Sequence, residues 1–275
     1  MTNLEEWIGR QQERTQVLDA HHTKLLAVTL DAAVPEKGTP LPPCWHWAWF
    51  NDALPASKLG RDGHPKHGSF LPPISLPRRM WAGGSLEFVA PLIIGQETKK
   101  VSTIESITHR KGSTGDLTII TVGHELFQSG HLCVNERQNL VFREDPKRDA
   151  PSPKPLAPPN GSEMTLEFTP TPTLMFRYSA LTFNGHRIHY DVDYAREVEG
   201  YPDLVFHAPL TATRLCDVAI KLAGDKPLSS FEYRATAPLF CNAPVKLCGK
   251  REQDKMTLWA VTPEDGQAML ATAKA

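Results

Sequence analysis

The spacing of apolar residues divides the chain into two stretches of similar plan. In the first, residues 15–30 have helical spacing, and three β-rich stretches follow at about 97–110, 116–128 and 131–143. Turn signals at Lys111-Gly112-Ser113 and Ser129-Gly130 separate these stretches. The pattern predicts one helix that faces an antiparallel sheet.

The second stretch repeats this order. A short helix is predicted from Asp191 to Glu199, ending at Gly200, and a longer apolar helix from about Ala208 to Leu222. Strands are predicted near 229–239, 244–251 and 255–262. Each stretch thus has a central helix wrapped by a meandering sheet, and the predicted fold class is α+β.

A proline-rich segment separates the two stretches. Six prolines fall within residues 144–160, where they remove backbone donors and favour extended geometry. We therefore predict an N-terminal half over residues 1–145, a linker over 146–160 and a C-terminal half over 161–275.

A second loop-rich region runs from about Val34 to Pro77 and contains the aromatic run Trp45–Phe50. The run alternates strongly enough to be either a strand or a pocket wall. A proline-rich loop of this length in a compact protein is usually functional or lies over a partner surface.

Charge and composition narrow the classes of partner. The chain has 30 basic and 31 acidic residues, so bulk electrostatics favour neither nucleic acid nor an anionic membrane. No apolar run approaches the ~18 residues of a membrane span. The acidic residues of the N-terminus also argue against secretory or mitochondrial targeting, and we expect a cytoplasmic protein.

The five cysteines are scattered and odd in number, so we predict reduced core thiols with no disulfide framework. Two histidine pairs, His64/His67 and His186/His189, have spacings that a metal could use. Neither has a further set of ligands nearby in the sequence, and the prediction is that no metal is bound.

Candidate chemistry concentrates in the segment Arg177–Asp191. It combines polar, titratable and small residues in an order too irregular for an amphipathic helix or an alternating strand. Such segments build a site or a turn. The alternative is that the two histidines of the segment are structural.

This segment resembles the motif of the MaoC-like hydratases, in which a catalytic Asp lies five residues before a catalytic His. His189 matches the His, Asn184 stands where the Asp would be, and His186 replaces an intervening Asn. The resemblance is closer to the branch of itaconyl-CoA hydratases, mesaconyl-C4-CoA hydratases and mitochondrial 3-hydroxyacyl-thioester dehydratases, which carries the signature SALTFN-x-HRIHYD found here. Three further segments resemble this branch, at 77–84, 199–205 and 233–240.

The resemblance implies a double hot-dog fold and an acyl-CoA hydratase that needs no cofactor beyond the CoA of its substrate. Hydration of an enoyl thioester requires a base, a proton source and an oxyanion site, and an imidazole suits the base. We expect His189 to be that base. Asn184 can orient water but cannot transfer a proton, so either His189 acts alone or another carboxylate helps. Asp191 is the nearest in sequence, but it is expected to cap a helix.

The oxyanion site is expected at the start of the long apolar helix, where backbone amides are free. The resemblance assigns this role to the amide of Ala208, with Pro209 suited to the first turn. Arg187 either contacts a substrate carboxylate or is a surface charge, and His207 either contacts substrate or packs the helix start. The substrate-binding candidates are Arg187, His186, His207, Arg79, Trp81 and Gly84.

The predicted reaction is hydration of a branched, carboxylate-bearing enoyl-CoA to a 3-hydroxyacyl-CoA. Itaconyl-CoA to citramalyl-CoA is the first choice and mesaconyl-C4-CoA the second. The alternatives are a 3-hydroxyacyl-thioester dehydratase of fatty-acid synthesis and a non-catalytic acyl-thioester-binding protein, since fold alone does not determine function. The expected partner is an acyl-CoA thioester, without nucleic acid or membrane, and a homodimer is left open.

Overall fold

The structure is a computed structural model that describes residues 3–112, 115–145 and 154–275. Within these ranges ten strands form one antiparallel sheet in the order β1-β3-β4-β5-β2-β7-β10-β9-β8-β6. The strands are β1 (Gln11–Val17), β2 (Arg78–Phe88), β3 (Glu97–Gly112), β4 (Gly115–Gln128), β5 (His131–Arg143), β6 (Met164–Phe168), β7 (Ser230–Ala235), β8 (Val245–Glu252), β9 (Lys255–Val261) and β10 (Gln267–Lys274).

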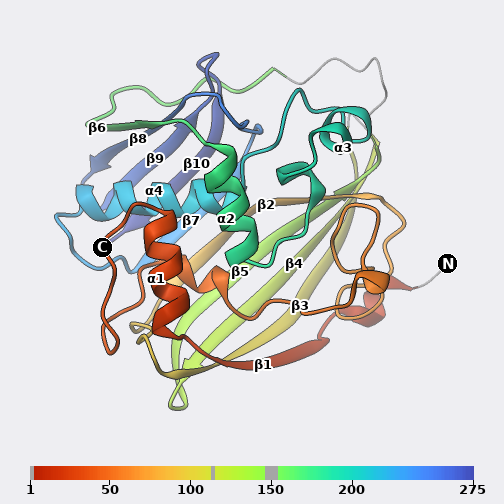
Figure 1. The fold of residues 1–275 in the computed structure, drawn as a ribbon, viewed down its shortest axis with the longest axis horizontal. Coiled ribbons are helices and arrows are strands. Elements are labelled where there is room, and N and C mark those ends of the chain that lie inside the picture. The colour runs from red at the N-terminus through yellow and green to blue at the C-terminus, as the bar shows by residue number, and fades with distance from the viewer. Residues whose placement is uncertain (1–2, 113–114, 146–153) are drawn as a thin grey trace.

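The helices α1, α2 and α4 lie over one face of this sheet (Figure 1). The α-helices of the described residues are α1 (Ala20–Thr29), α2 (Pro172–Leu181), α3 (Val192–Glu197) and α4 (Ala208–Leu222). Helix α4 packs on β8, β9 and β10, and its residues Leu210, Leu215 and Val218 are fully buried. Burial of this apolar stripe holds the start of α4 in the interior of the molecule.

The two halves of the sequence meet at one strand pair. Strands β1 to β5 come from residues 11–143 and β6 to β10 from residues 164–274, and β2 pairs with β7 where they join. At this seam a Cβ on Gly84 would lie 2.2 Å from the carbonyl oxygen of Arg137 and 2.4 Å from the Tyr233 hydroxyl. Gly84 therefore allows close strand packing, and its predicted role in substrate binding stays a prediction.

Several predicted elements are confirmed. The three β-rich stretches of the first half correspond to β3, β4 and β5, and the three strand predictions of the second half to β7, β8 and β9. The long helix has the predicted bounds Ala208–Leu222, and α3 begins after Asp191, whose side chain accepts a hydrogen bond from the Tyr194 amide. The α+β class is therefore correct.

Other predictions fail for physical reasons. Residues 15–17 are not helical because they pair with β3, and α1 begins only after Asp19, whose carboxylate caps it by accepting from the His22 amide. The aromatic run forms a 3₁₀ turn over Trp45–Ala48 rather than a strand, and the alternative of a pocket wall holds, because Trp47, Trp49 and Phe50 line the cavity. Helix α2 was not predicted, because its last five residues fall in the segment Arg177–Asp191, whose residue pattern as a whole is irregular.

Of the predicted linker, residues 146–153 lie outside the described residues. Further along it, Leu156 forms an isolated antiparallel bridge with Gln267. The exact boundaries of the two halves stay a prediction.

Candidate active site

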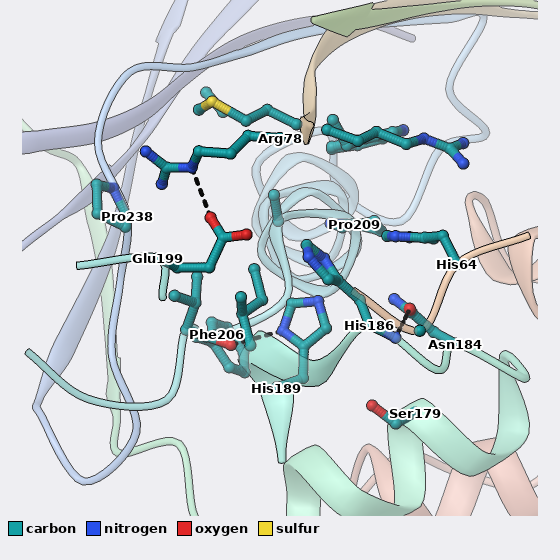
Figure 2. Close-up of a pocket in the computed structure, with 18 of the residues that line it drawn as sticks. His64, Arg78, Ser179, Asn184, His186, His189, Glu199, Phe206, Pro209 and Pro238 are labelled. Atoms are coloured by element: carbon teal, nitrogen blue, oxygen red, sulfur yellow. Dashed lines mark hydrogen bonds and ion pairs between the residues drawn. The ribbon is translucent and has the colours of Figure 1, made fainter. Parts of the chain in front are cut away.

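A cavity of about 2050 Å³ lies between residues of both halves of the sequence. Figure 2 shows its wall around His189, with His186, Asn184 and His64 on one side and Glu199 and Arg78 on the other. Six of the site residues predicted from the sequence line it: His189, Asn184, His186, Ala208, Arg79 and Trp81.

His189 has a defined tautomer and orientation. It ends a 3₁₀ turn over Arg187–His189, and its side chain is buried. Its Nδ1 atom lies 2.7 Å from the carbonyl oxygen of Val205. Because a carbonyl oxygen can only accept, Nδ1 carries the proton and Nε2 has the free lone pair.

Burial lowers the pKa of His189 to about 4, against a smaller opposing effect of the Val205 hydrogen bond. The imidazole is therefore neutral at neutral pH. A neutral ring with its lone pair on Nε2 can take a proton from water, as the sequence analysis expected of a base.

His207 packs against the ring of His189. Their rings stack with centroids 3.8 Å apart and planes inclined by 20°. The Nε2 atom of His207 lies 2.7 Å from the Ser179 hydroxyl oxygen, and the residue is fully buried and absent from the cavity wall. The His207 side chain thus contacts His189 and Ser179 and does not line the cavity, and its predicted substrate-binding role stays a prediction.

Asn184 lies at the end of α2, where its backbone amide donates to the Ser179 carbonyl oxygen over 2.8 Å. Its side-chain oxygen accepts from the backbone amide of His186 at 3.0 Å. With that oxygen engaged, the Nδ2 donor is the group left to meet a ligand in the cavity. Asn184 is placed to hold water or a carbonyl oxygen by donation.

Ala208 opens helix α4 beside His189 and lines the cavity. The preceding residue, His207, makes no capping hydrogen bond with its side chain, and Pro209 has no amide hydrogen. The Ala208 amide therefore lies at a helix start where backbone donors lack helical partners and the dipole favours negative charge. This is the geometry that an oxyanion site requires.

Arg187 does not line the cavity, and of its two predicted roles the contact with a substrate carboxylate stays a prediction. Its Nε and Nη2 atoms donate to one oxygen of Asp191 at 2.9 and 2.7 Å, and its Nη1 donates to the Arg61 carbonyl oxygen at 3.2 Å. Its guanidinium also lies 4.2 Å from the ring centre of Tyr194. Arg187 is held as part of the loop structure.

Arg79 is the better placed cation. It lies on β2 and on the cavity wall, and no hydrogen bond or ion pair holds its guanidinium within the described residues. Burial lowers its pKa, and the nearby charge of Asp62 opposes that effect. Beyond it on β2, Trp81 stacks on Tyr233 with ring centres 4.3 Å apart. Both residues can contact a ligand from the first half.

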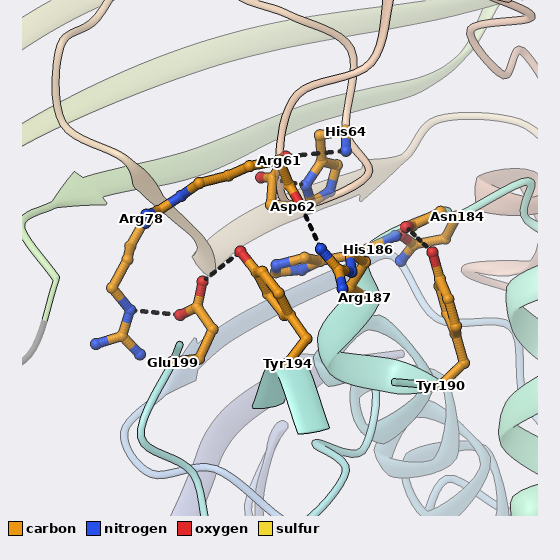
Figure 3. Close-up of polar contacts among 11 residues, drawn as sticks. Arg61, Asp62, His64, Arg78, Asn184, His186, Arg187, Tyr190, Tyr194 and Glu199 are labelled. Atoms are coloured by element: carbon orange, nitrogen blue, oxygen red, sulfur yellow. Dashed lines mark hydrogen bonds and ion pairs between the residues drawn. The ribbon is translucent and has the colours of Figure 1, made fainter. Parts of the chain in front are cut away.

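Two further polar pairs reach this region that the sequence analysis did not propose for catalysis or substrate binding. The carboxylate of Glu199 lies on the cavity wall and pairs with Arg78 Nε at 2.5 Å, and it also accepts from the Tyr194 hydroxyl at 3.3 Å. On the opposite side, His64 is paired with Asp62 (Figure 3). The signals in the sequence were the spacing of His64 and His67 and the length of the loop, which was predicted to be functional or to lie over a partner surface.

Asp62, His64 and His186 are the one group among the described residues whose potential ligand atoms all lie within 4.8 Å of one another. The carboxylate of Asp62 and the Nδ1 of His64 are already hydrogen-bonded to each other. The positive charge of Arg79 also lowers the pKa of both histidines, after the larger effect of burial. We therefore interpret the group as a hydrogen-bonded cluster.

The five cysteines are all free and buried, as the sequence analysis predicted. Among the residues that the structure describes, no helix combines the length and the apolar character needed to span a membrane.

The comparison with known families agrees with this site. Residues 44–241 match the family described as "Hydroxyacyl-thioester dehydratase type 2". The chain belongs to this family. It is also 41% identical over 271 residues to a mesaconyl-C(4)-CoA hydratase from Chloroflexus aurantiacus, covering 98% of this chain and 96% of the relative. The chain is therefore a hydro-lyase of the hydratase and dehydratase type, and a purely non-catalytic binding role is wrong.

Solved structures agree on the fold. A MaoC-like dehydratase matches with a TM-score of 0.75 at 14% identity, covering 98% of this chain and 99% of that one. A Mycobacterium tuberculosis protein described as having a double hot-dog fold matches with a TM-score of 0.58 at 12% identity, covering 97% and 96%. The predicted double hot-dog architecture is confirmed.

Proposed function

We propose that this chain hydrates a branched, carboxylate-bearing enoyl-CoA to a 3-hydroxyacyl-CoA in the cytoplasm. The observation that carries the hydratase reaction is the neutral His189, with its lone pair on Nε2, on the wall of a cavity that Ala208 at the start of α4 also lines. The similarity to a mesaconyl-C(4)-CoA hydratase supports mesaconyl-C4-CoA as the first candidate substrate, with itaconyl-CoA second.

In this reaction the Nε2 atom of His189 takes a proton from water as the water oxygen bonds to Cβ of the acyl group. The electron pair of the double bond moves toward the thioester, and the amide of Ala208 stabilises the charge on the thioester oxygen. Asn184 orients the water by donation from Nδ2.

The position of Arg79 supports the proposal that the substrate carries a free carboxylate. A guanidinium without a protein partner on a cavity wall can form a bidentate contact with a carboxylate of the acyl group. Such a contact discriminates against uncharged acyl groups, because the guanidinium would then be desolvated without compensation.

The test compares hydration of mesaconyl-C4-CoA, itaconyl-CoA and crotonyl-CoA by the wild type and by Arg79→Met. We expect Arg79→Met to lower kcat/KM for the carboxylate-bearing substrate by ~1–3 kcal/mol and to change crotonyl-CoA hydration little. Arg187→Met is the matched control, because it removes the same charge from a residue outside the cavity wall. A wild type that prefers crotonyl-CoA would contradict the proposal.

A dehydratase of long 3-hydroxyacyl thioesters is the second candidate. The family description and a cavity of about 2050 Å³, which exceeds the ~300–1,000 Å³ of ordinary small-molecule sites, favour it. Dehydration of a long 3-hydroxyacyl-CoA at a higher kcat/KM than hydration of mesaconyl-C4-CoA would support this candidate against the first.

A further inference from the structure

Asn184 leaves the reaction one proton-transfer group short. Hydration needs a base for water and a proton for Cα, and an amide side chain can supply neither. Two carboxylates of the segment that follows His189 are engaged, since Asp191 caps α3 and pairs with Arg187, while Glu199 pairs with Arg78 and Tyr194. A second titratable group must come from elsewhere on the wall.

The loop around His64 reaches the catalytic segment from the other half of the chain. The backbone amide of Arg187 donates to the carbonyl oxygen of Asp62 over 2.8 Å. Gly63 packs so closely that a Cβ would lie 1.9 Å from the carbonyl oxygen of Gly185, and its φ is +88°. These contacts require glycine at position 63 and place His64 on the cavity wall.

Asp62 holds His64 with both of its oxygens. Oδ1 accepts from the backbone amide of His64 at 3.0 Å, and Oδ2 accepts from its Nδ1 at 3.0 Å. The side chains of Asp62 and His64 are only 13% and 19% exposed. This carboxylate–imidazole pair keeps the lone pair on Nε2 and can balance a positive charge on the ring.

The His64 ring continues an array of imidazoles that ends at His189. The ring centres of His64 and His186 are 4.4 Å apart, and those of His186 and His189 are 5.4 Å apart. His64 and His189 thus lie on two sides of His186 at the same cavity, as Figure 2 shows.

We propose that His64, held by Asp62, is the second acid–base residue of this hydratase and delivers the proton to Cα. This inference rests on the proposed hydration. His189 takes one proton from water as the C–O bond forms at Cβ, and the double-bond electron pair becomes the enolate. A C–H bond then forms at Cα with the proton of Nε2–H on the His64 cation, which becomes neutral. The site resets when His189 releases its proton to water in the cavity and His64 takes one up.

The charges around His64 come from three parts of the chain. Asp62 and His67 lie on its own loop, Arg79 lies on β2, and His186 lies on the catalytic segment. Burial and the cations lower the pKa of His64, whereas the Asp62 hydrogen bond raises it. Removal of the Asp62 charge should therefore shift the titration of His64 to lower pH.

The experiment measures kcat, KM and the pH profile of hydration for His64→Gln, Asp62→Asn and the control His67→Gln, on the enoyl-CoA that the wild type hydrates best. His67 lies on the same loop, bonds to the Ile74 carbonyl oxygen and is absent from the cavity wall. We expect His64→Gln to lower kcat about 10²-fold with little change in KM, and His67→Gln to stay within about twofold of the wild type. Asp62→Asn should shift the limb of the profile that requires protonated His64 to lower pH.

A second variant at position 64 distinguishes the loss of a proton-transfer group from a structural effect of the substitution. His64→Gly removes the ring and leaves space for free imidazole, which should restore part of kcat as its concentration rises. Normal kcat in His64→Gln, or a loss confined to KM for carboxylate-bearing substrates, would overturn the proposal. Loss of wild-type activity with a chelator and its return with zinc would also overturn it, in favour of metal binding. A wild type that hydrates no enoyl-CoA would instead refute the proposed function.

Discussion

Each half of the molecule buries a cluster of polar groups, and the two clusters differ in how far their hydrogen-bonding capacity is used. In the first half, Glu136 is 1% exposed, and its carboxylate accepts from Trp47 Nε1 at 2.8 Å and Gln138 Nε2 at 2.7 Å. Its other oxygen lies 3.1 Å from His46 Nε2. Burial would raise the pKa of Glu136, but the contacts with His46 outweigh it and lower the pKa to about 2.

The cluster of the second half is built mainly from imidazoles and leaves some hydrogen-bonding atoms without a protein partner. His189 uses Nδ1 to bond Val205 and keeps Nε2 at the cavity, and Asn184 uses its oxygen and keeps its amide donor. A fully paired cluster stabilises the fold, whereas a partly paired one on a cavity wall can bind and react. The difference predicts that substitutions in the two clusters affect different properties.

The largest effect is expected from His189→Ala. Loss of the base should lower kcat by about 10² or more with the fold retained, because activation of water then depends on solvent alone. The pKa of about 4 also predicts that the acid limb of the kcat/KM profile of the wild type lies near that value, where the base becomes protonated. Steady-state rates across pH test both statements, and near-normal turnover would remove His189 from the mechanism.

Glu136→Ala should act on stability instead. It leaves the ring of His46 and the indole N–H of Trp47 buried without their acceptor, which should lower the free energy of unfolding by about 3 kcal/mol. Urea denaturation measures this. Glu105→Ala is the control, because Glu105 pairs with Arg137 near the surface at 2.8 Å and should cost less than about 1 kcal/mol. Equal losses for the two variants would show that the buried cluster has no special role in stability.

Asn184→Ala should lower kcat about 10²-fold, because the amide that donates a hydrogen bond to the attacking water is lost. Asn184→Asp is the sharper probe, since a carboxylate can still accept from the His186 amide and so preserve the loop. The Nδ2 donor is lost, and the new negative charge raises the pKa of His189 from about 4. We therefore expect a slower enzyme in which the acid limb of the rate profile moves to higher pH. An Asp variant as fast as the wild type at neutral pH would indicate that a carboxylate at this position can share the chemistry.

The smallest effect is expected from Arg187→Met. Its ion pair with Asp191 is partly exposed, at 39% and 28% of the two side chains, so its loss should cost less than about 1 kcal/mol of stability. Hydration of charged and uncharged enoyl-CoA substrates should change equally. A selective loss on the carboxylate-bearing substrate would return Arg187 to substrate recognition.

The sequence by itself determined the elements whose signals are local. The apolar periodicity of 208–222 predicted α4 with its observed bounds, and turn residues delimited β3, β4 and β5. The motif around His189 identified the family and predicted the base, because the spacing of Asn184, His186 and His189 is a local property. Local spacing also suggested that Ala208 opens the helix at the oxyanion site.

Only the tertiary structure decided which of these side chains face the cavity. Arg187 and His207 are as close to His189 in the sequence as residues that line the cavity. Yet the Arg187 side chain pairs with Asp191, and the His207 ring packs on the ring of His189. The Asp62–His64 pair lies more than a hundred residues away and reaches the site because the loop contacts the catalytic segment at Gly63 and Arg187. Contacts between distant segments depend on the packing of the whole fold, and no periodicity or spacing along the chain encodes them.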